Sequence, residues 1–150
     1  DNTLSHSGSD HASLVHESPS HQVPARGQQR RFAVERRRLY LVDPDPVFLF
    51  RYSALTFNGH RIHYDAPYVT DVEGYPGLIV HGPLTATLLL ELVRRELPNE
   101  SIKTTVIRAR RPLFSGSRFR VEGLPTESGA HTWAVDPEGF VAMTADVTFS

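Results

Sequence analysis

Residues 82–97, GPLTATLLLELVRREL, form the clearest helical pattern in the chain. Pro83 stands in the first turn, where its missing N–H is harmless, and Pro98 predicts the end of the helix because the residue before a proline avoids the α conformation. The segment is apolar on several sides until Glu91, so we expect a sheet to cover it. The large apolar residues recur at helical spacing: Leu84, Leu88, Leu92 and Val93.

The sequence after this helix predicts an antiparallel meander of four strands. The strand-like stretches are residues 102–110, 117–124, 131–135 and 140–149. The last of them alternates most clearly, with apolar Val141, Met143, Ala145 and Val147 at every second position. Residues 136–139, DPEG, predict a tight turn before it. A long antiparallel sheet curled around one helix satisfies this order, and it is an α+β arrangement.

The segment before the long helix predicts shorter elements. Residues 39–42, LYLV, are typical of a strand. Asp45 and Pro46 suit the start of a helix, so residues 47–55 predict a short buried helix, with a strand as the alternative. Residues 56–65 are interpreted as a polar loop rich in histidine, and residues 71–77 as a turn.

The chain divides by composition near residue 33. Residues 1–33 are almost free of large apolar groups, which predicts a flexible tail or linker, and residues 34–150 hold the ordered domain. Histidines recur every five residues in the first segment, a spacing that places them on one face of neither a helix nor a strand. We therefore predict no metal site there. The chain has no cysteine, which excludes disulfides and a thiol nucleophile.

The totals exclude several classes of function. The net charge is -1, with 16 basic and 17 acidic residues, so we predict no nucleic-acid partner. No apolar run approaches the ~20 residues that span a bilayer, so we predict no membrane segment. The chain has no dinucleotide fingerprint, and we expect no cofactor. The compartment stays open between cytoplasm and mitochondrion.

Two separate segments, residues 51–65 (RYSALTFNGHRIHYD) and 77–85 (GLIVHGPLT), resemble the MaoC-like, or hydratase 2, family. The similarity is greatest to its branch of 3-hydroxyacyl-thioester dehydratases type 2 and mesaconyl-CoA hydratases. The resemblance covers about residues 36–150. It implies a hot-dog fold, in which an antiparallel sheet wraps around a long central helix. It also implies the hydration of a 2-enoyl thioester, or the reverse dehydration, on coenzyme A or an acyl carrier protein.

The resemblance implies roles for three residues of the first segment. His63 takes the position of the catalytic histidine, and an imidazole with a pKa near ~6.5 suits a base that activates water. Asn58 takes the position where many members have aspartate, and it has no titratable proton. In our interpretation its amide holds the water. His60 either supplies the second proton or orients the loop by hydrogen bonds.

The enolate that forms in such a reaction needs hydrogen-bond donors. Free N–H groups and the dipole at the start of the long helix favour negative charge, and the Gly82 amide is the first candidate because Pro83 has no N–H. Three further residues are candidates for substrate binding: His81, Tyr52 and Tyr64. Each of them either lines the pocket or has only a structural role, packed in the core. Arg110, with Arg108, either meets carrier phosphates or protects an edge strand.

Two other functions remain open at this point. A thioesterase uses the same fold with water attacking the carbonyl carbon, and a non-catalytic acyl-binding half of a hot-dog assembly needs no acid–base pair. Because a hot-dog sheet has an exposed edge, we expect a homodimer or pairing with another hot-dog domain.

Overall fold

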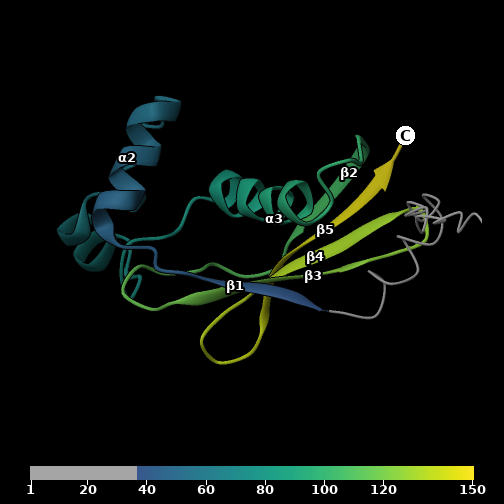
Figure 1. Ribbon diagram of the computed structural model, residues 1–150. Helices are drawn as coiled ribbons and strands as arrows, with labels where there is room; N and C mark the ends of the chain where they lie inside the picture. The colour runs from purple at the N-terminus through teal and green to yellow at the C-terminus, as the bar shows by residue number, and fades with distance from the viewer. Residues whose placement is uncertain (1–36) are drawn as a thin grey trace, which may run out of the picture.

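The computed structural model describes residues 37–150, which form one antiparallel sheet with a long helix lying across one face (Figure 1). The strand order is β1-β3-β4-β5-β2, with every neighbouring pair antiparallel. The tail or linker predicted for residues 1–33, and its histidines, lie outside the described residues. The strands are β1 (Arg38–Val42), β2 (Ile102–Ala109), β3 (Phe119–Pro125), β4 (Gly129–Val135) and β5 (Val141–Phe149).

Helix α3 (Gly82–Glu96) is the predicted long helix, and it ends two residues before Pro98. It packs against β3, β4 and β5. Gly123 of β3 permits this close approach, because a Cβ there would lie 2.8 Å from Thr132 and 3.1 Å from Leu92 of the helix. The side chains that α3 buries lie on its sheet-facing side: Leu84, Thr85, Leu89, Leu92 and Val93.

The strand connections differ from the predicted meander in one respect. Strands β3, β4 and β5 follow one another as hairpins, but β2 crosses to the far side and pairs with β5. The period of a strand shows which residues share a face, but it does not name the neighbour. The turn predicted at residues 136–139 is confirmed: the Phe140 N–H donates to the Asp136 carboxylate at 2.8 Å, and Gly139 has φ 95°.

Residues 47–55 are helical, as the capping pattern predicts. They belong to α2 (Pro46–Thr56), and the Asp45 side chain accepts a hydrogen bond from the Phe48 N–H at 2.9 Å. The prediction that this helix is buried is wrong, because it buries only Leu49 and Ser53, one turn apart. An apolar composition does not reveal whether the chain itself supplies a cover. The exposed apolar residues of this region are Val47, Phe50, Leu55 and Phe57.

The segment between α2 and α3 contains two short helical turns that its sequence does not announce. These are a 3₁₀ turn at Arg61–His63, inside the predicted loop, and a π turn at Tyr68–Val72. The predicted turn follows them, with Gly74 at φ 72°. The chain then returns, and the Ile79 N–H donates to the Ile62 carbonyl at 3.0 Å. This hydrogen bond places His63 beside the start of α3.

Candidate active site

His63 lies at the centre of the candidate site. It ends the 3₁₀ turn, and only 7% of the residue is exposed. Its Nδ1 lies 2.7 Å from the Ile79 carbonyl oxygen. A carbonyl oxygen only accepts hydrogen bonds, so Nδ1 carries the proton and Nε2 holds a lone pair. Nε2 has no hydrogen-bond partner among residues 37–150 and is not a fully buried atom.

The surroundings of His63 favour its neutral form. Burial lowers the pKa of His63 below its ordinary value, and nearby His60 lowers it further, while the hydrogen bond to Ile79 opposes both. The ring is therefore neutral at pH 7. A neutral ring with Nδ1 protonated presents Nε2 as a base.

His60 lies next to His63, and Asn58 is hydrogen-bonded to His60. The rings of His60 and His63 meet edge to face, with centroids 5.6 Å apart. The Asn58 carbonyl oxygen accepts a hydrogen bond from the His60 N–H at 3.0 Å, which fixes the loop and leaves the amide NH₂ group as a donor. His60 is exposed and Asn58 is half-buried, so both side chains have access to solvent.

His81 lies directly against His63. The two rings stack, with centroids 3.7 Å apart and an angle of 19° between their planes. His81 is fully buried, and its Nε2 lies 2.8 Å from the Ser53 hydroxyl oxygen. The Tyr52 ring meets the His81 ring edge-on, with centroids 4.8 Å apart. Burial lowers the pKa of His81 to about 4, with a further contribution from His63, so this ring is also neutral.

Gly82 lies at the first position of α3, immediately after His81. Its N–H has no acceptor in the described part of the chain, as expected for the first turn of a helix. Gly82 also lines a cavity of about 350 Å³, together with Ile79, Thr85, Ala142 and Met143. The cavity therefore combines an apolar wall with a free N–H at the positive end of a helix dipole.

His63 does not line this cavity itself, but it is hydrogen-bonded to Ile79, which does. The contact between His63 and the cavity lining is thus made through Nδ1 and the Ile79 carbonyl. The spatial relation between His63 and the Gly82 region follows from the His63–His81 stack and the peptide bond between His81 and Gly82.

Arg110 also lines the cavity that includes Gly82. It follows the end of β2, where its N–H and that of Arg111 both donate to the Ala142 carbonyl. Arg110 makes no ion pair with the residues described by the structure, whereas Arg111 pairs with Asp136 at 3.1 Å. The expected partner residue Arg108 pairs with Asp146 instead. Of these three arginines, Arg110 is the one without an ion-pair partner in the described residues.

Tyr64 lies apart from the cavity lining. Its hydroxyl donates to the Gly59 carbonyl at 2.9 Å, and 39% of the residue is exposed. Tyr64 thus closes the loop that holds His60. Asp65 fixes the other end of the same loop by accepting hydrogen bonds from Arg61 and from the Tyr68 N–H.

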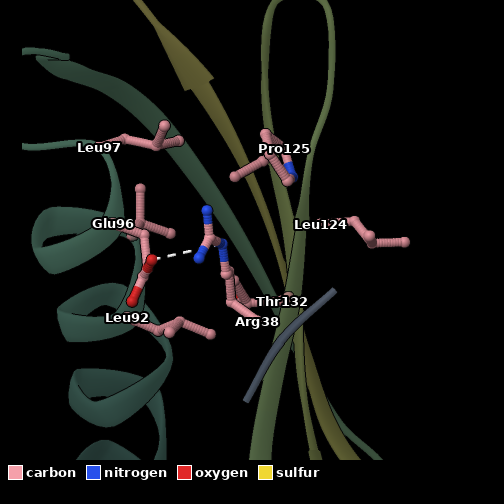
Figure 2. A pocket seen from close by; sticks show the side chains of 10 residues that line it. Arg38, Leu92, Glu96, Leu97, Leu124, Pro125 and Thr132 are labelled. Carbon is pink, nitrogen blue, oxygen red and sulfur yellow. Dashed lines mark ion pairs between the residues drawn. The ribbon is translucent and has the colours of Figure 1, made fainter. Parts of the chain in front are cut away.

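A second cavity, between α3 and the β3–β4 side of the sheet, has a volume of only about 30 Å³ (Figure 2). This is room for a single water molecule. Arg38 and Glu96 form an ion pair across it at 3.4 Å, and Leu92 and Leu97 add apolar lining. It shares no residue with the cavity at Gly82 and is too small for an acyl thioester.

Two negative findings apply to residues 37–150. No group of three or more His, Asp or Glu side chains is placed to hold a metal ion. None of the helices in this range is both long and apolar enough to cross a membrane.

Ser53 is the site residue that sequence reasoning did not assign. A serine between Tyr52 and Ala54, four residues after buried Leu49, lies on the inward side of α2. A buried hydroxyl was predictable from that position. The pairing of Ser53 with His81 was not predictable, because an irregular segment separates the two residues.

Comparisons with known proteins find a matching family model and similar curated proteins. The family model of hydroxyacyl-thioester dehydratase type 2 matches residues 5–115. Mesaconyl-C(4)-CoA hydratase of Chloroflexus aurantiacus is 42% identical over 134 residues, which cover 89% of this chain and 48% of that protein. The mitochondrial hydroxyacyl-thioester dehydratase type 2 of Schizosaccharomyces pombe is 39% identical over 84 residues, covering 55% of this chain and 28% of that protein.

A solved structure shows the same fold. The (R)-hydratase of A. caviae involved in PHA biosynthesis superposes with a TM-score of 0.69 and 19% identity, over 78% of this chain and 95% of that one. The expected α+β hot-dog fold is therefore confirmed. The chain spans less than half the length of the two curated relatives. The family match begins at residue 5, so it includes most of the segment expected to be a tail or linker.

Proposed function

The chain belongs to the hydroxyacyl-thioester dehydratase type 2 family, and from this premise we propose that it interconverts a 2-enoyl thioester and a 3-hydroxyacyl thioester. One observation supports the proposal most strongly: the Nδ1 proton of His63 is bound to the Ile79 carbonyl, so Nε2 has a free lone pair on a ring that stacks against the residue preceding α3. A base and an N–H donor thus lie on neighbouring segments.

In the hydration direction, Nε2 of His63 accepts a proton from water as the water oxygen bonds to the β-carbon. The electron pair of the carbon–carbon double bond moves toward the thioester oxygen. The Gly82 N–H and the dipole of α3 stabilise the negative charge on that oxygen. A proton then adds to the α-carbon and completes the addition of one water molecule.

The neighbours of His63 supply the remaining roles. The Asn58 amide NH₂ donates to the attacking water oxygen, since its carbonyl oxygen is bound to the His60 N–H. His60 relays the second proton from its exposed position. His81 and Tyr52 pack behind His63, and Tyr64 closes the loop.

Arg110 is proposed to bind a phosphate of the thioester carrier. It lines the same cavity as Gly82 and has no ion-pair partner among the described residues. Guanidinium groups bind phosphate through charge-assisted hydrogen bonds. Coenzyme A and the phosphopantetheine arm of an acyl carrier protein both contain phosphate, so both are proposed carriers.

The partner is proposed to be a second hot-dog domain, either in a homodimer or in a longer chain. Strand β2 is an unpaired edge of the sheet in the described residues, with Val106 and Ile107 exposed. The outer side of α2 exposes Phe50 and Leu55. Relatives twice as long as this chain have room for such a domain. A stable, fully active monomer in a solution-mass measurement would rule the partner out.

The reaction is tested with crotonyl-CoA and mesaconyl-CoA. Hydration removes the absorbance of the conjugated enoyl thioester without releasing thiol, and the product is identified by mass. Release of free coenzyme A without loss of the double bond would indicate a thioesterase. Binding of the thioesters with neither change would indicate a non-catalytic acyl-binding half. The Schizosaccharomyces pombe relative is named as mitochondrial, and the compartment proposed here stays cytoplasmic or mitochondrial.

A further inference from the structure

We propose that Ser53 and His81 form a positioning pair that fixes the plane of the His63 ring and, through it, the direction of the Nε2 lone pair. The inference deepens the proposed function, because only in that reaction does the lone pair act as a base. It rests on contacts among three different segments of the chain: α2, the 3₁₀ turn and the start of α3.

The first contact is the stack itself. A centroid distance of 3.7 Å with an angle of 19° brings one whole face of the His63 ring against His81. The hydrogen bond from Nδ1 to Ile79 fixes only one atom of the ring, so it permits rotation about that bond. A flat neighbour against the ring face removes this rotation. The two restraints together define the direction of Nε2.

The second contact holds His81 in place. Its ring is fully buried, and its Nε2 shares a hydrogen bond of 2.8 Å with Ser53, which is 5% exposed. Tyr52, the residue before Ser53, lies edge-on to the same ring. Both residues come from α2, so the helix that precedes the loop holds the ring that supports His63. The irregular segment between them does not have to be rigid for His63 to be positioned.

The remaining nitrogen of His81 explains why this support is neutral. Its Nδ1 is buried without a hydrogen-bond partner in the described residues. Protonating His81 would bury an N–H and a charge with no acceptor, which is costly. The titratable side chains that face His63 are therefore His60, from its own loop, and a neutral His81. A neutral His81 ring shields His63 from water without placing a positive charge beside it.

The test follows the His63 ring directly by ¹⁵N NMR titration, together with kcat and KM for crotonyl-CoA. In Ser53→Ala we expect the pKa of His63 to rise toward its ordinary value, because a loosened His81 admits water. We also expect kcat to fall roughly 10- to 100-fold with KM little changed, since misplacing a reacting group by ~1 Å costs up to about 100-fold. Ser53→Thr retains the hydroxyl and should restore both values.

Two further variants separate the ring from the hydrogen bond. His81→Phe keeps an aromatic face against His63 but loses the hydrogen bond to Ser53, so it should raise the pKa of His63 as Ser53→Ala does. His81→Leu loses both the hydrogen bond and the aromatic face, so it should raise that pKa further and lower kcat more. Ser128→Ala, at an exposed serine in the β3–β4 turn, is the matched control and should leave both readouts unchanged. If Ser53→Ala does not fold, the His81 variants decide the question.

A folded Ser53→Ala or His81→Leu protein with the wild-type His63 titration and wild-type kcat would overturn the inference. The proposed function fails separately: a wild-type protein that hydrates no enoyl thioester refutes the reaction, while the NMR titration still reports whether Ser53 and His81 hold the His63 ring.

Discussion

Replacing His63 with glutamine tests the assigned base with the least damage to the fold. The glutamine amide can donate to the Ile79 carbonyl in place of Nδ1, so the hydrogen bond of 2.7 Å has a substitute worth about 1 kcal/mol. The stack against His81 is lost, and aromatic pairs of this kind contribute about 0.5–1.5 kcal/mol. The variant is therefore expected to fold, with a modestly lower free energy of unfolding.

The effect on the reaction should be much larger. General-base catalysis contributes roughly 10²–10⁴-fold to rate. At 1.36 kcal/mol for each factor of ten, this corresponds to about 3–5 kcal/mol of barrier. His63→Gln should lower kcat for crotonyl-CoA hydration by that factor, because an amide cannot accept the proton from water. KM should change little, since Nε2 contacts the water rather than the carrier.

The pH profile gives the same prediction a second readout. His63 is an effective base only when neutral, and burial lowers the pKa of His63 below its ordinary value. Wild-type kcat/KM should therefore be constant near pH 7 and fall only as the pH drops through that lowered pKa, below about 6.5. This decrease of kcat/KM at low pH should be absent in His63→Gln. His131→Gln, on the outer side of β4 beside Asp146, is the control. A folded His63→Gln protein within threefold of wild-type kcat would refute the assignment.

Three further predictions concern the helix start, the carrier and stability. Gly82→Ala should retain or raise the Tm, because the added Cβ meets only Met143 at 3.9 Å. It should lower kcat/KM at least about tenfold, because the methyl group blocks the approach of the thioester oxygen to the N–H. Unchanged turnover would argue against the Gly82 N–H as the donor. Arg110→Gln should raise KM about tenfold for a CoA thioester but not for a thioester that lacks phosphate. Arg118→Gln, at an exposed arginine, is the control. The same change in KM for both substrates would argue against phosphate binding by Arg110. The contribution of His81 to the free energy of unfolding should be greatest above pH 6.5 and should decrease as the pH falls toward 4. The reason is that the pKa of His81 is lowered to about 4 in the folded protein, so the unfolded chain binds the proton more readily. A Tm that does not change with pH in this range would contradict the prediction.

The fold was largely predictable because local signals mark its main elements. Pro83 and Pro98 bracket α3, and the alternation of residues 141–149 defines β5. The position of β2 beside β5 was not predictable, since strand periodicity does not identify a neighbour. The exposure of α2 was missed for a related reason: its apolar residues indicate a partner surface, but the described chain does not supply it.

The site was predictable to a different degree. The resemblance of two segments predicted roles for His63, Asn58 and His60, and the start of the predicted helix indicated Gly82. The structure brings His60, His63, His81 and the helix start together. The sequence could not reveal the stack of His63 on His81, because the packing of an irregular segment depends on tertiary contacts. His81 packs against His63 and is not among the residues that line the cavity at Gly82.

The most direct measurement is a ¹⁵N NMR titration of the wild-type protein at pH 7 with a 3-hydroxyacyl-CoA. The proposed reaction predicts a His63 ring that is protonated at Nδ1 and not at Nε2 before addition. It also predicts that the ligand shifts the His63 Nε2 signal and the Gly82 amide signal together, at the same ligand concentration. A ring protonated at Nε2, or a bound ligand that leaves either signal unmoved, would contradict it.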